Sequence, residues 1–243
     1  REPTPESIRA ALRGAVARGQ LYPVLLGSAL QNAGIQPLLD GIVDYLPNPR
    51  ERGAIQALAL PSGEPLLLPP DPAGPLCAFV FKVQRIGGRE LAFLRLYSGS
   101  LSRGQTVHIP RLDRSVVVGE LLRVHADGGE PIESARAGEI AAWRGAEACL
   151  TGDTLCAPGT PLALERPEFS EPVLSITIEP LRSQDRAALG QALELLARED
   201  PTLRLREDPE TGLWLLSGMG ELHLEVVQRR LEDEFRLGVR IGE

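Results

Sequence analysis

The last third of the chain constrains the fold most, because its hydrophobic pattern changes between the strand period and the helix period in a fixed order. Residues 173–179, VLSITIE, alternate strictly between apolar and polar side chains, which predicts a half-buried strand. Residues 183–200 then carry apolar side chains at helical spacing, and Pro201 closes this predicted helix. We expect Ser183 to be the N-cap, because a serine hydroxyl accepts a hydrogen bond from the free N–H groups of a first turn.

Two further strands, a second helix and a final strand complete the pattern. Residues 203–206 and 213–216 flank the turn-prone stretch EDPETG and predict a hairpin. Residues 220–235 again place apolar side chains at helical spacing, and LGVRI at 237–241 alternates. The order is strand, helix, strand, strand, helix, strand, which is typical of a ferredoxin-like domain, here over residues 169–243.

The middle of the chain contains only strand signals. Short runs rich in apolar and β-branched residues, most of them separated by glycine, lie between residues 76 and 158, and IGGR at 86–89 predicts a two-glycine hairpin connection. Five or more such strands in about 80 residues predict a small closed β-barrel. The predicted strands are CAFVFKV, LAFLRLY, QTVHI, SVVVGELLRV and EIAAW.

The first segment predicts a helix over residues 6–19, a short apolar strand over 22–30 and a second helix over 35–46 with one apolar face. Half of an α/β unit cannot cover its own apolar faces, so we expect the end of a larger domain here. A proline-rich boundary follows at residues 47–75, although AIQALAL within it could be a strand. We therefore predict three units, 1–52, 53–160 and 169–243.

The net charge and the cysteines argue against several classes of function. The net charge of −7 argues against a chain that coats nucleic acid uniformly but leaves room for a local basic face. Cys77, Cys149 and Cys156 form no CxxC, which favours buried reduced thiols over a metal or disulfide framework. No apolar run reaches the roughly 18 residues of a membrane helix, so we expect a cytoplasmic protein.

The stretch SGMGELHLEV at residues 217–226 contains a histidine between two carboxylates. His223 and Glu225 point about 160° apart on a helix of 3.6 residues per turn, so they do not form a hydrogen-bonded dyad. Glu225 can instead pair with Arg229 at the next turn. An independent α+β enzyme that uses His223 with Glu221 or Glu225 stays an alternative, but a sharp strand-to-helix turn built on glycines is favoured.

The residues of five stretches carry a family resemblance. LSGMGELHLEVVQRRLEDEF resembles the third domain of elongation factor G, the ribosomal translocation GTPase. FLRLYSGSLSRGQTV, LLRVHADGGEPIESARAGEIAA and TGDTL resemble the β-barrel second domain of that family, and VLLGSALQNAGIQPLLDGIVDYLPNP resembles the end of its G domain. The resemblance implies a multi-domain α+β fold. A Greek-key β-barrel precedes the ferredoxin-like βαββαβ domain and follows the C-terminal piece of an α/β P-loop GTPase domain.

The resemblance also implies a nucleotide site. In that family the loop matching Ser28, Ala29 and Leu30 contacts the guanine base, chiefly through a backbone N–H. GTP and Mg²⁺ are then expected in a longer parent GTPase. This chain has no GxxxxGK[ST] loop and no NKxD. We expect it to be a piece of that protein that by itself neither holds nor hydrolyses GTP, with no catalytic or metal-binding residue of its own.

The partner implied by the resemblance is the ribosome, through small-subunit rRNA and proteins, for a monomer that binds neither membrane nor DNA. The hairpin KVQRIGGRELAFLRLYSG is shorter than is usual in elongation factor G, and its RLYSG is also similar to tetracycline-resistance ribosomal protection proteins. A paralogue acting in ribosome recycling or protection, or a free-standing interaction module, therefore stays an alternative. The candidate RNA contacts are Arg85, Arg89, Arg103, Arg111, Arg114 and Arg123.

Overall fold

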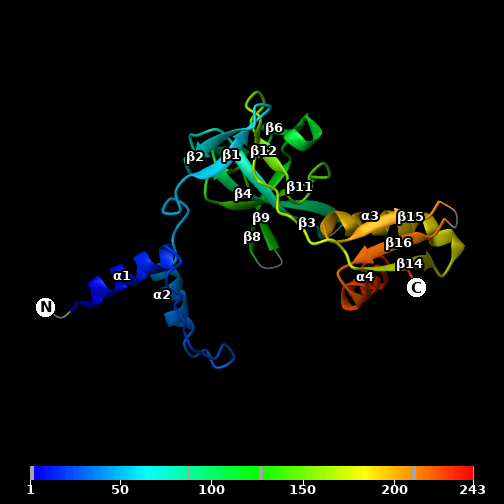
Figure 1. Cartoon of the computed structure of the whole chain (residues 1–243), viewed down its shortest axis with the longest axis horizontal. Coiled ribbons are helices and arrows are strands. Elements are labelled where there is room, and N and C mark those ends of the chain that lie inside the picture. The colour runs from blue at the N-terminus through cyan, green and yellow to red at the C-terminus, as the bar shows by residue number, and fades with distance from the viewer. Residues whose placement is uncertain (1–2, 87, 126–127, 210–211, 243) are drawn as a thin grey trace.

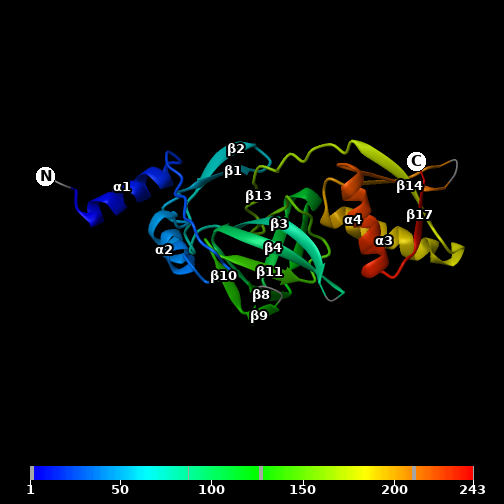
Figure 2. The ribbon, with the colours of Figure 1, turned by 90° about the horizontal axis from the view of Figure 1, so that it is seen from below.

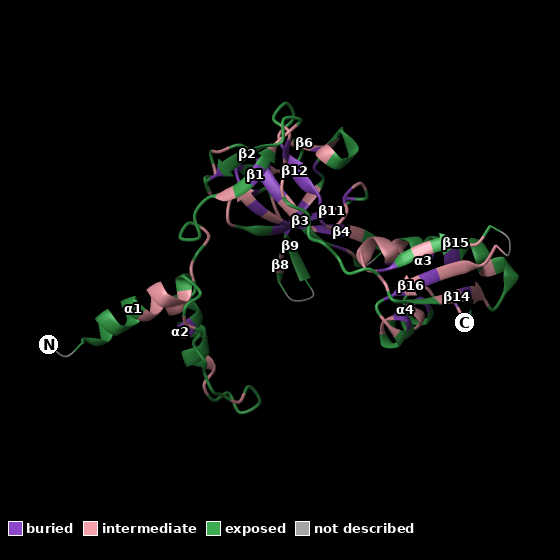
Figure 3. Ribbon diagram, in the orientation of Figure 1, coloured by how far each residue is buried: buried purple, intermediate pink, exposed green. Residues whose placement is uncertain are grey.

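The computed structural model describes residues 3–86, 88–125, 128–209 and 212–242. A helical segment, a β-barrel and an α+β unit follow one another along the long axis of the molecule, with the N-terminus and the C-terminus at opposite ends (Figures 1 and 2). Buried residues gather in the barrel and in the α+β unit, whereas the helical segment is mostly exposed (Figure 3).

The helical segment consists of α1 (Pro5–Ala17) and α2 (Ile35–Tyr45). The guanidinium of Arg13 on α1 donates to the carbonyls of Val43 and Asp44, at 3.0 and 2.7 Å, and also pairs with Glu51. These bonds tie α1 to the C-terminal end of α2. The predicted apolar face of α2 is largely uncovered, with Ile42 and Val43 47% and 75% exposed.

The strand predicted over residues 22–30 is wrong. These residues form no strand, and the single β-bridge of this part of the chain joins Ser28 to Ala33. An extended segment becomes a strand only when a neighbouring strand accepts and donates its backbone hydrogen bonds. Among the described residues, none lies beside this segment as a strand partner.

The barrel centres on an eight-stranded antiparallel sheet. Its order is β7-β6-β12-β3-β4-β11-β8-β9, while β5 pairs with β10, and β1 lies between β13 and β2 in a smaller sheet. One buried cluster fills the barrel, with Leu94, Leu101, Leu121 and Leu155 fully buried. The bounds are β1 Ile55–Ala59, β2 Glu64–Leu68, β3 Cys77–Ile86, β4 Arg89–Ser98, β5 Ser100–Ser102, β6 Thr106–Ile109, β7 Arg114–Val117, β8 Glu120–His125, β9 Gly128–Ile132, β10 Ser134–Arg136, β11 Ile140–Arg144, β12 Thr154–Cys156 and β13 Leu162–Ala163.

Two details of the barrel differ from or refine the sequence predictions. The run SVVVGELLRV is two strands rather than one, because β7 pairs with β6 and β8 pairs with β11 on opposite sides of Gly119. A side chain at Gly119 would crowd the neighbouring strand, since a Cβ atom would lie 3.1 Å from the carbonyl oxygen of Arg144. In the hairpin predicted at IGGR, Ile86 pairs with Arg89, while residue 87 lies outside the described residues.

The α+β unit has the predicted order βαββαβ. It consists of β14 (Leu174–Pro180), α3 (Arg186–Glu199), β15 (Arg204–Glu207), β16 (Trp214–Gly218), α4 (Glu221–Asp233) and β17 (Val239–Gly242). All pairings are antiparallel and the sheet order is β15-β16-β14-β17, with the two helices packed on one face (Figure 2). A separate core joins Leu189 and Leu193 of α3 to Leu224 and Leu231 of α4. This is the ferredoxin-like arrangement.

The start of α3 differs from its prediction. Ser183 opens a short 3₁₀ turn, Ser183–Asp185, and the α-helix begins only at Arg186. Asp185 occupies the N-cap position, and its side chain makes no capping hydrogen bond. The 3₁₀ turn postpones the α-helix by a few residues, so the serine lies before the helix rather than at its cap. The turn predicted at EDPETG includes residues 210 and 211, which lie outside the described residues.

Candidate functional site

The loop of Ser28, Ala29 and Leu30 lies immediately before α2. Ser28 and Ala33 exchange two backbone hydrogen bonds, at 2.9 and 3.0 Å, and close the loop. Gly27 and Gly34 flank it so tightly that a Cβ on Gly27 would lie 2.7 Å from the carbonyl oxygen of Ala33. Only glycine permits this approach of two backbone segments. Leu30 is fully exposed, and within the described part of the chain neither Ala29 nor Leu30 donates its N–H to another backbone group.

The stretch at residues 217–226 forms the turn from β16 into α4. Gly220 has φ 156° and ψ 178°, a conformation essentially restricted to glycine, and it is the N-cap of α4. A Cβ on Gly218 would lie 2.9 Å from the side chain of Leu224 and 3.1 Å from the ring of His223. The backbone conformation therefore favours glycine strongly at position 220, as the sequence predicts for a sharp turn, while a side chain at position 218 would have to displace Leu224 and His223.

His223 is held between this turn and the connection from α3 to β15. Its Nδ1 accepts a hydrogen bond from the N–H of Met219 at 3.1 Å, which leaves Nε2 to donate to Asp200 Oδ2 at 2.9 Å. Asp200 Oδ1 accepts two further bonds from Thr202, at 2.8 Å from N and 2.6 Å from Oγ1. His223 thus joins two loops of the domain, and its carboxylate partner is neither Glu221 nor Glu225.

The predicted pair of Glu225 and Arg229 is also absent among the described residues. The neighbouring Arg230 instead pairs with Glu234 at 2.6 Å and with Glu199 at 2.7 Å. These hydrogen bonds raise the pKa of Arg230 despite its partial burial. The arginine that pairs is therefore Arg230, which reaches Glu199 on α3, and not Arg229, which the four-residue spacing favours.

We expect Gly220→Val to lower the free energy of unfolding by about 1–3 kcal/mol, because a β-branched residue is strained at φ 156°. Nothing lies within 4 Å of the added Cβ, so the cost comes from the backbone conformation and not from a clash. Urea unfolding measures the change. Met219→Val, one residue earlier, leaves the glycine in place and should cost less; equal losses at both positions would contradict the backbone argument.

The hydrogen bonds of Asp200 with His223 and Thr202, here called the Asp200 clamp, depend on pH. Burial raises the pKa of this carboxyl, but the hydrogen bonds from Thr202 and His223 outweigh burial and leave the pKa below its ordinary value. A carboxyl with a lowered folded pKa stabilises the protein above its unfolded pKa, and the contribution is lost as the pH falls through the folded pKa. We expect Asp200→Asn to cost about 1 kcal/mol at pH 7.

The difference in unfolding free energy between wild type and Asp200→Asn should shrink as the pH falls below about 4. Urea titrations across that range measure it. Asp233→Asn, an exposed carboxyl on α4, is the control and should follow the wild type throughout. A difference that stays constant to the lowest pH would show that the charge of Asp200 contributes nothing to the clamp.

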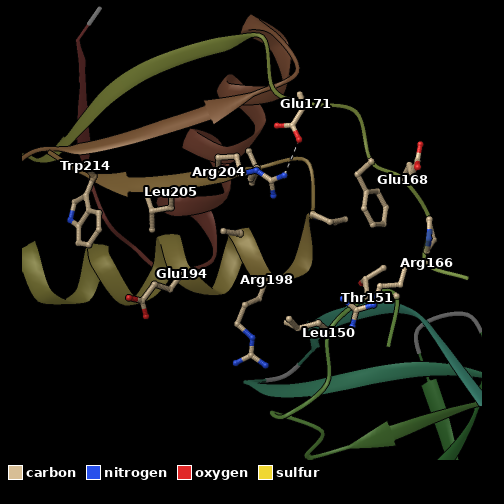
Figure 4. A pocket seen from close by; sticks show the side chains of 16 residues that line it. Leu150, Thr151, Arg166, Glu168, Glu171, Glu194, Arg198, Arg204, Leu205 and Trp214 are labelled. Carbon is tan, nitrogen blue, oxygen red and sulfur yellow. Dashed lines mark hydrogen bonds and ion pairs between the residues drawn. The ribbon is translucent and has the colours of Figure 1, made fainter. Parts of the chain in front are cut away.

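The ferredoxin-like domain meets the barrel through α3. Arg198 pairs with Glu90 of β4 at 2.9 Å and donates to the carbonyl of Glu147, while Glu199 accepts the N–H of Arg85 at 2.5 Å. Burial raises the pKa of Glu90, and the neighbouring Arg198 offsets this only in part. Beside these contacts is a cavity of about 1020 Å³. Both positively charged arginines and negatively charged glutamates line it (Figure 4).

A buried carboxylate holds the segment between the two domains. Asp153 is fully buried and accepts hydrogen bonds from Arg111, at 2.7 and 2.9 Å, from Arg166 at 2.9 Å and from the N–H of Leu150 at 2.9 Å. The bonds with Asp153 raise the pKa of Arg111. The Arg111 guanidinium is therefore already bonded within the fold, to Asp153 and to the carbonyl of Ala148.

The other five candidate arginines are exposed: Arg85, Arg89, Arg103, Arg114 and Arg123. The residues that sequence reasoning missed are the partners brought in from afar, Asp200, Asp153 and Arg198. A signal for Asp153 is present in the sequence, since it lies in the motif TGDTL, but the motif by itself indicates no role for the carboxylate.

The three cysteines are buried, as predicted. Burial raises the pKa of Cys77 and of Cys149 to about 12, so both are neutral thiols at physiological pH. Among the residues that the structure describes, no cluster of three histidine, cysteine or acidic side chains could hold a metal. No helix within the described ranges is long and apolar enough to cross a membrane.

The order and the sites define the class: a multi-domain α+β protein in which a β-barrel of the translation-factor type precedes a ferredoxin-like domain. The family model described as Elongation factor G domain 2 matches residues 75–158, and that described as Elongation Factor G, domain III matches residues 169–243. The chain therefore belongs to the elongation factor G family, and the predicted barrel and ferredoxin-like domain are both confirmed.

Individual relatives agree over nearly the whole chain. It is 46% identical to elongation factor G of Pseudothermotoga lettingae over 98% of its length and 47% identical to elongation factor G 1 of Geobacter sulfurreducens, also over 98%. A solved structure from Thermus thermophilus superposes with a TM-score of 0.76 at 33% identity, covering 99% of this chain and 34% of the other. The chain spans about a third of the length of the relatives it matches.

Proposed function

We propose that this chain is the ribosome-docking and coupling part of a translocation GTPase, and that the longer protein uses GTP hydrolysis to drive movement of tRNA and mRNA in the cytoplasm. The observation that carries the proposal is the colinear match of both domains to domains of elongation factor G. Residues 1–52, 53–160 and 169–243 are the proposed units: the end of a GTP-binding domain, the barrel and the ferredoxin-like domain.

The uncovered surface of the first unit supports its place at the edge of a larger domain. Val24 and Leu26 are 84% and 90% exposed, next to the exposed apolar face of α2. Exposed apolar patches of this kind mark surfaces that another element covers. In the longer protein, the rest of the GTP-binding domain is the proposed cover.

The coupling role rests on the contacts between the domains. Arg198 and Glu199, at the C-terminal end of α3, reach Glu90 and Arg85 of the barrel, while His223 joins the same end of α3 to the start of α4. A displacement of either domain therefore has to break charged contacts of known residues. Each of these contacts is either formed or broken. An element that couples two sites needs two such distinct states.

Binding to purified ribosomes tests this proposal. The 243-residue chain should sediment with small ribosomal subunits, be displaced by an elongation factor G from a relative, and bind more weakly as salt rises. Binding that no elongation factor G displaces, or no saturable binding at all, would overturn it. In the longer protein, ribosome-stimulated GTP hydrolysis is the second measurement.

We propose that Ser28, Ala29 and Leu30 contact the guanine base in the longer protein. The unpaired N–H groups of Ala29 and Leu30 suit the base oxygen, whereas the sequence contains no GxxxxGK[ST] loop for the phosphates and Mg²⁺. When bound, the nucleotide would supply the phosphate bond that is hydrolysed. Ala29→Pro or Leu30→Pro, which each remove one N–H, should reduce the preference for GDP over ADP, with Ala29→Gly as the control. An unchanged preference in both proline variants would contradict this assignment.

A further inference from the structure

The outer face of two barrel strands carries an unusual concentration of aromatic side chains. Three of the five phenylalanines of the chain lie on the outer face of β3 and β4, together with one tyrosine and one arginine. Residues between them, such as Val80, Leu94 and Leu96, point into the core, so the alternation of the strands puts the aromatic residues outside. These outer residues are Phe79, Phe81, Phe93, Arg95 and Tyr97.

A hollow of about 610 Å³ lies over this face. Three neighbouring strands, β3, β4 and β11, form its floor. Phe79, Arg95 and Ile140 lie opposite one another on these strands. Its wall is the segment between α2 and β1, which contributes Pro49 and Arg52. Gly138 lets this wall approach the barrel, since a Cβ there would lie 3.2 Å from Pro49.

The described residues that line the hollow carry only positive charge. Arg52 and Arg95 line it, and no carboxylate of the described residues does, in a chain whose net charge is −7. Neither guanidinium forms an ion pair with a carboxylate among the described residues. Two acidic neighbours in the sequence are already engaged: Glu51 binds Arg13, and Glu139 accepts the N–H of Arg136.

Cations also lie over the rings of this face. The guanidinium of Arg95 is 5.9 Å from the ring centroid of Tyr97, and Lys82, the single lysine of the chain, is 5.5 Å from that of Phe93. Phe81 is 40% exposed, with its ring centroid 6.2 Å from that of Phe93. A nucleotide outside a double helix binds where its base can stack on a flat ring and its phosphate can meet a cation. This face offers both, because its rings lie next to cations that form no ion pair.

We propose that this hollow receives an unpaired base of an RNA strand, which stacks on Phe81 while its phosphates meet Arg52 and Arg95. The inference rests on the proposed docking to the ribosome and names a contact surface for it. A double helix keeps its bases stacked on one another, so the partner is a single-stranded loop, bulge or end. The aromatic faces favour RNA over an acidic peptide, which would use the arginines alone.

A short single-stranded RNA with 2-aminopurine at its centre tests the proposal, because stacking changes the emission of this base. The chain should change the emission saturably. Phe81→Leu, which keeps an apolar side chain but removes the flat ring, should weaken binding roughly five- to hundredfold. Arg95→Gln should also weaken binding and should make the slope of log affinity against log salt shallower by about 0.7.

Arg182→Gln is the matched control, since it removes the same charge from an exposed position before α3, outside the hollow. Equal losses at Arg182 and Arg95 would mean that the RNA responds only to net charge, and would overturn the proposal. Displacement of the RNA by guanosine monophosphate or by polyglutamate, as readily as by unlabelled RNA, would overturn it too. If the chain binds ribosomal subunits but leaves the emission unchanged, the hollow is rejected while the proposed function stands.

Discussion

Asp153→Asn should lower the free energy of unfolding by about 2–4 kcal/mol, the largest effect expected for any single charge in the chain. The substitution keeps the shape of the side chain but removes the charge that faces Arg111 and Arg166 in a fully buried position. Arg111 would then keep a partly buried guanidinium without its anion. Urea unfolding at pH 7 measures the loss.

Asp113→Asn is the control for this prediction. Asp113 is 98% exposed at its side chain and has a φ of 46°, a conformation that asparagine also adopts. We expect its substitution to change stability by less than about 0.5 kcal/mol. Similar losses for the two variants would show that Asp153 does not stabilise the connection between the domains.

Leu193→Ala should destabilise the ferredoxin-like domain by about 3 kcal/mol while leaving the barrel intact. Leu193 is fully buried in the core between α3 and α4, and its truncation removes apolar contacts and leaves a cavity. The core of the barrel shares no residue with this one. Calorimetry should therefore show one unfolding transition moved to lower temperature and the other unchanged.

Two further variants make the test of separate cores complete. Leu94→Ala, at a fully buried position of the barrel, should lower the other transition instead. Leu222→Ala, on α4 but 74% exposed, should lower neither. A single transition that moves with both buried variants would show that the two domains unfold as one cooperative unit, held by contacts such as Arg198 with Glu90.

Local patterns predicted the elements wherever the neighbours of an element lie close in the sequence. The ferredoxin-like order was readable because each helix and strand shows its own period, and the turn at Gly220 was readable because glycine is required there. The segment at residues 22–30 has the composition of a strand but is none, since a strand depends on a partner that composition does not contain. The prediction of Ser183 as the N-cap was wrong for a related reason. The spacing of apolar residues does not indicate the 3₁₀ turn that precedes α3.

The candidate sites divide in the same way. Motif wording alone is enough to single out the loop of Ser28, Ala29 and Leu30 and the stretch around His223. By itself, then, the sequence determined the order of the elements in the ferredoxin-like domain, the family and the glycine turn at Gly220, because these depend on residues a few positions apart. Only the tertiary structure decided that Asp200 is the partner of His223, that Asp153 holds Arg111, and that aromatic and arginine side chains meet in one hollow. Charges and rings act over a few ångströms, and folding brings such groups together from positions far apart in the chain.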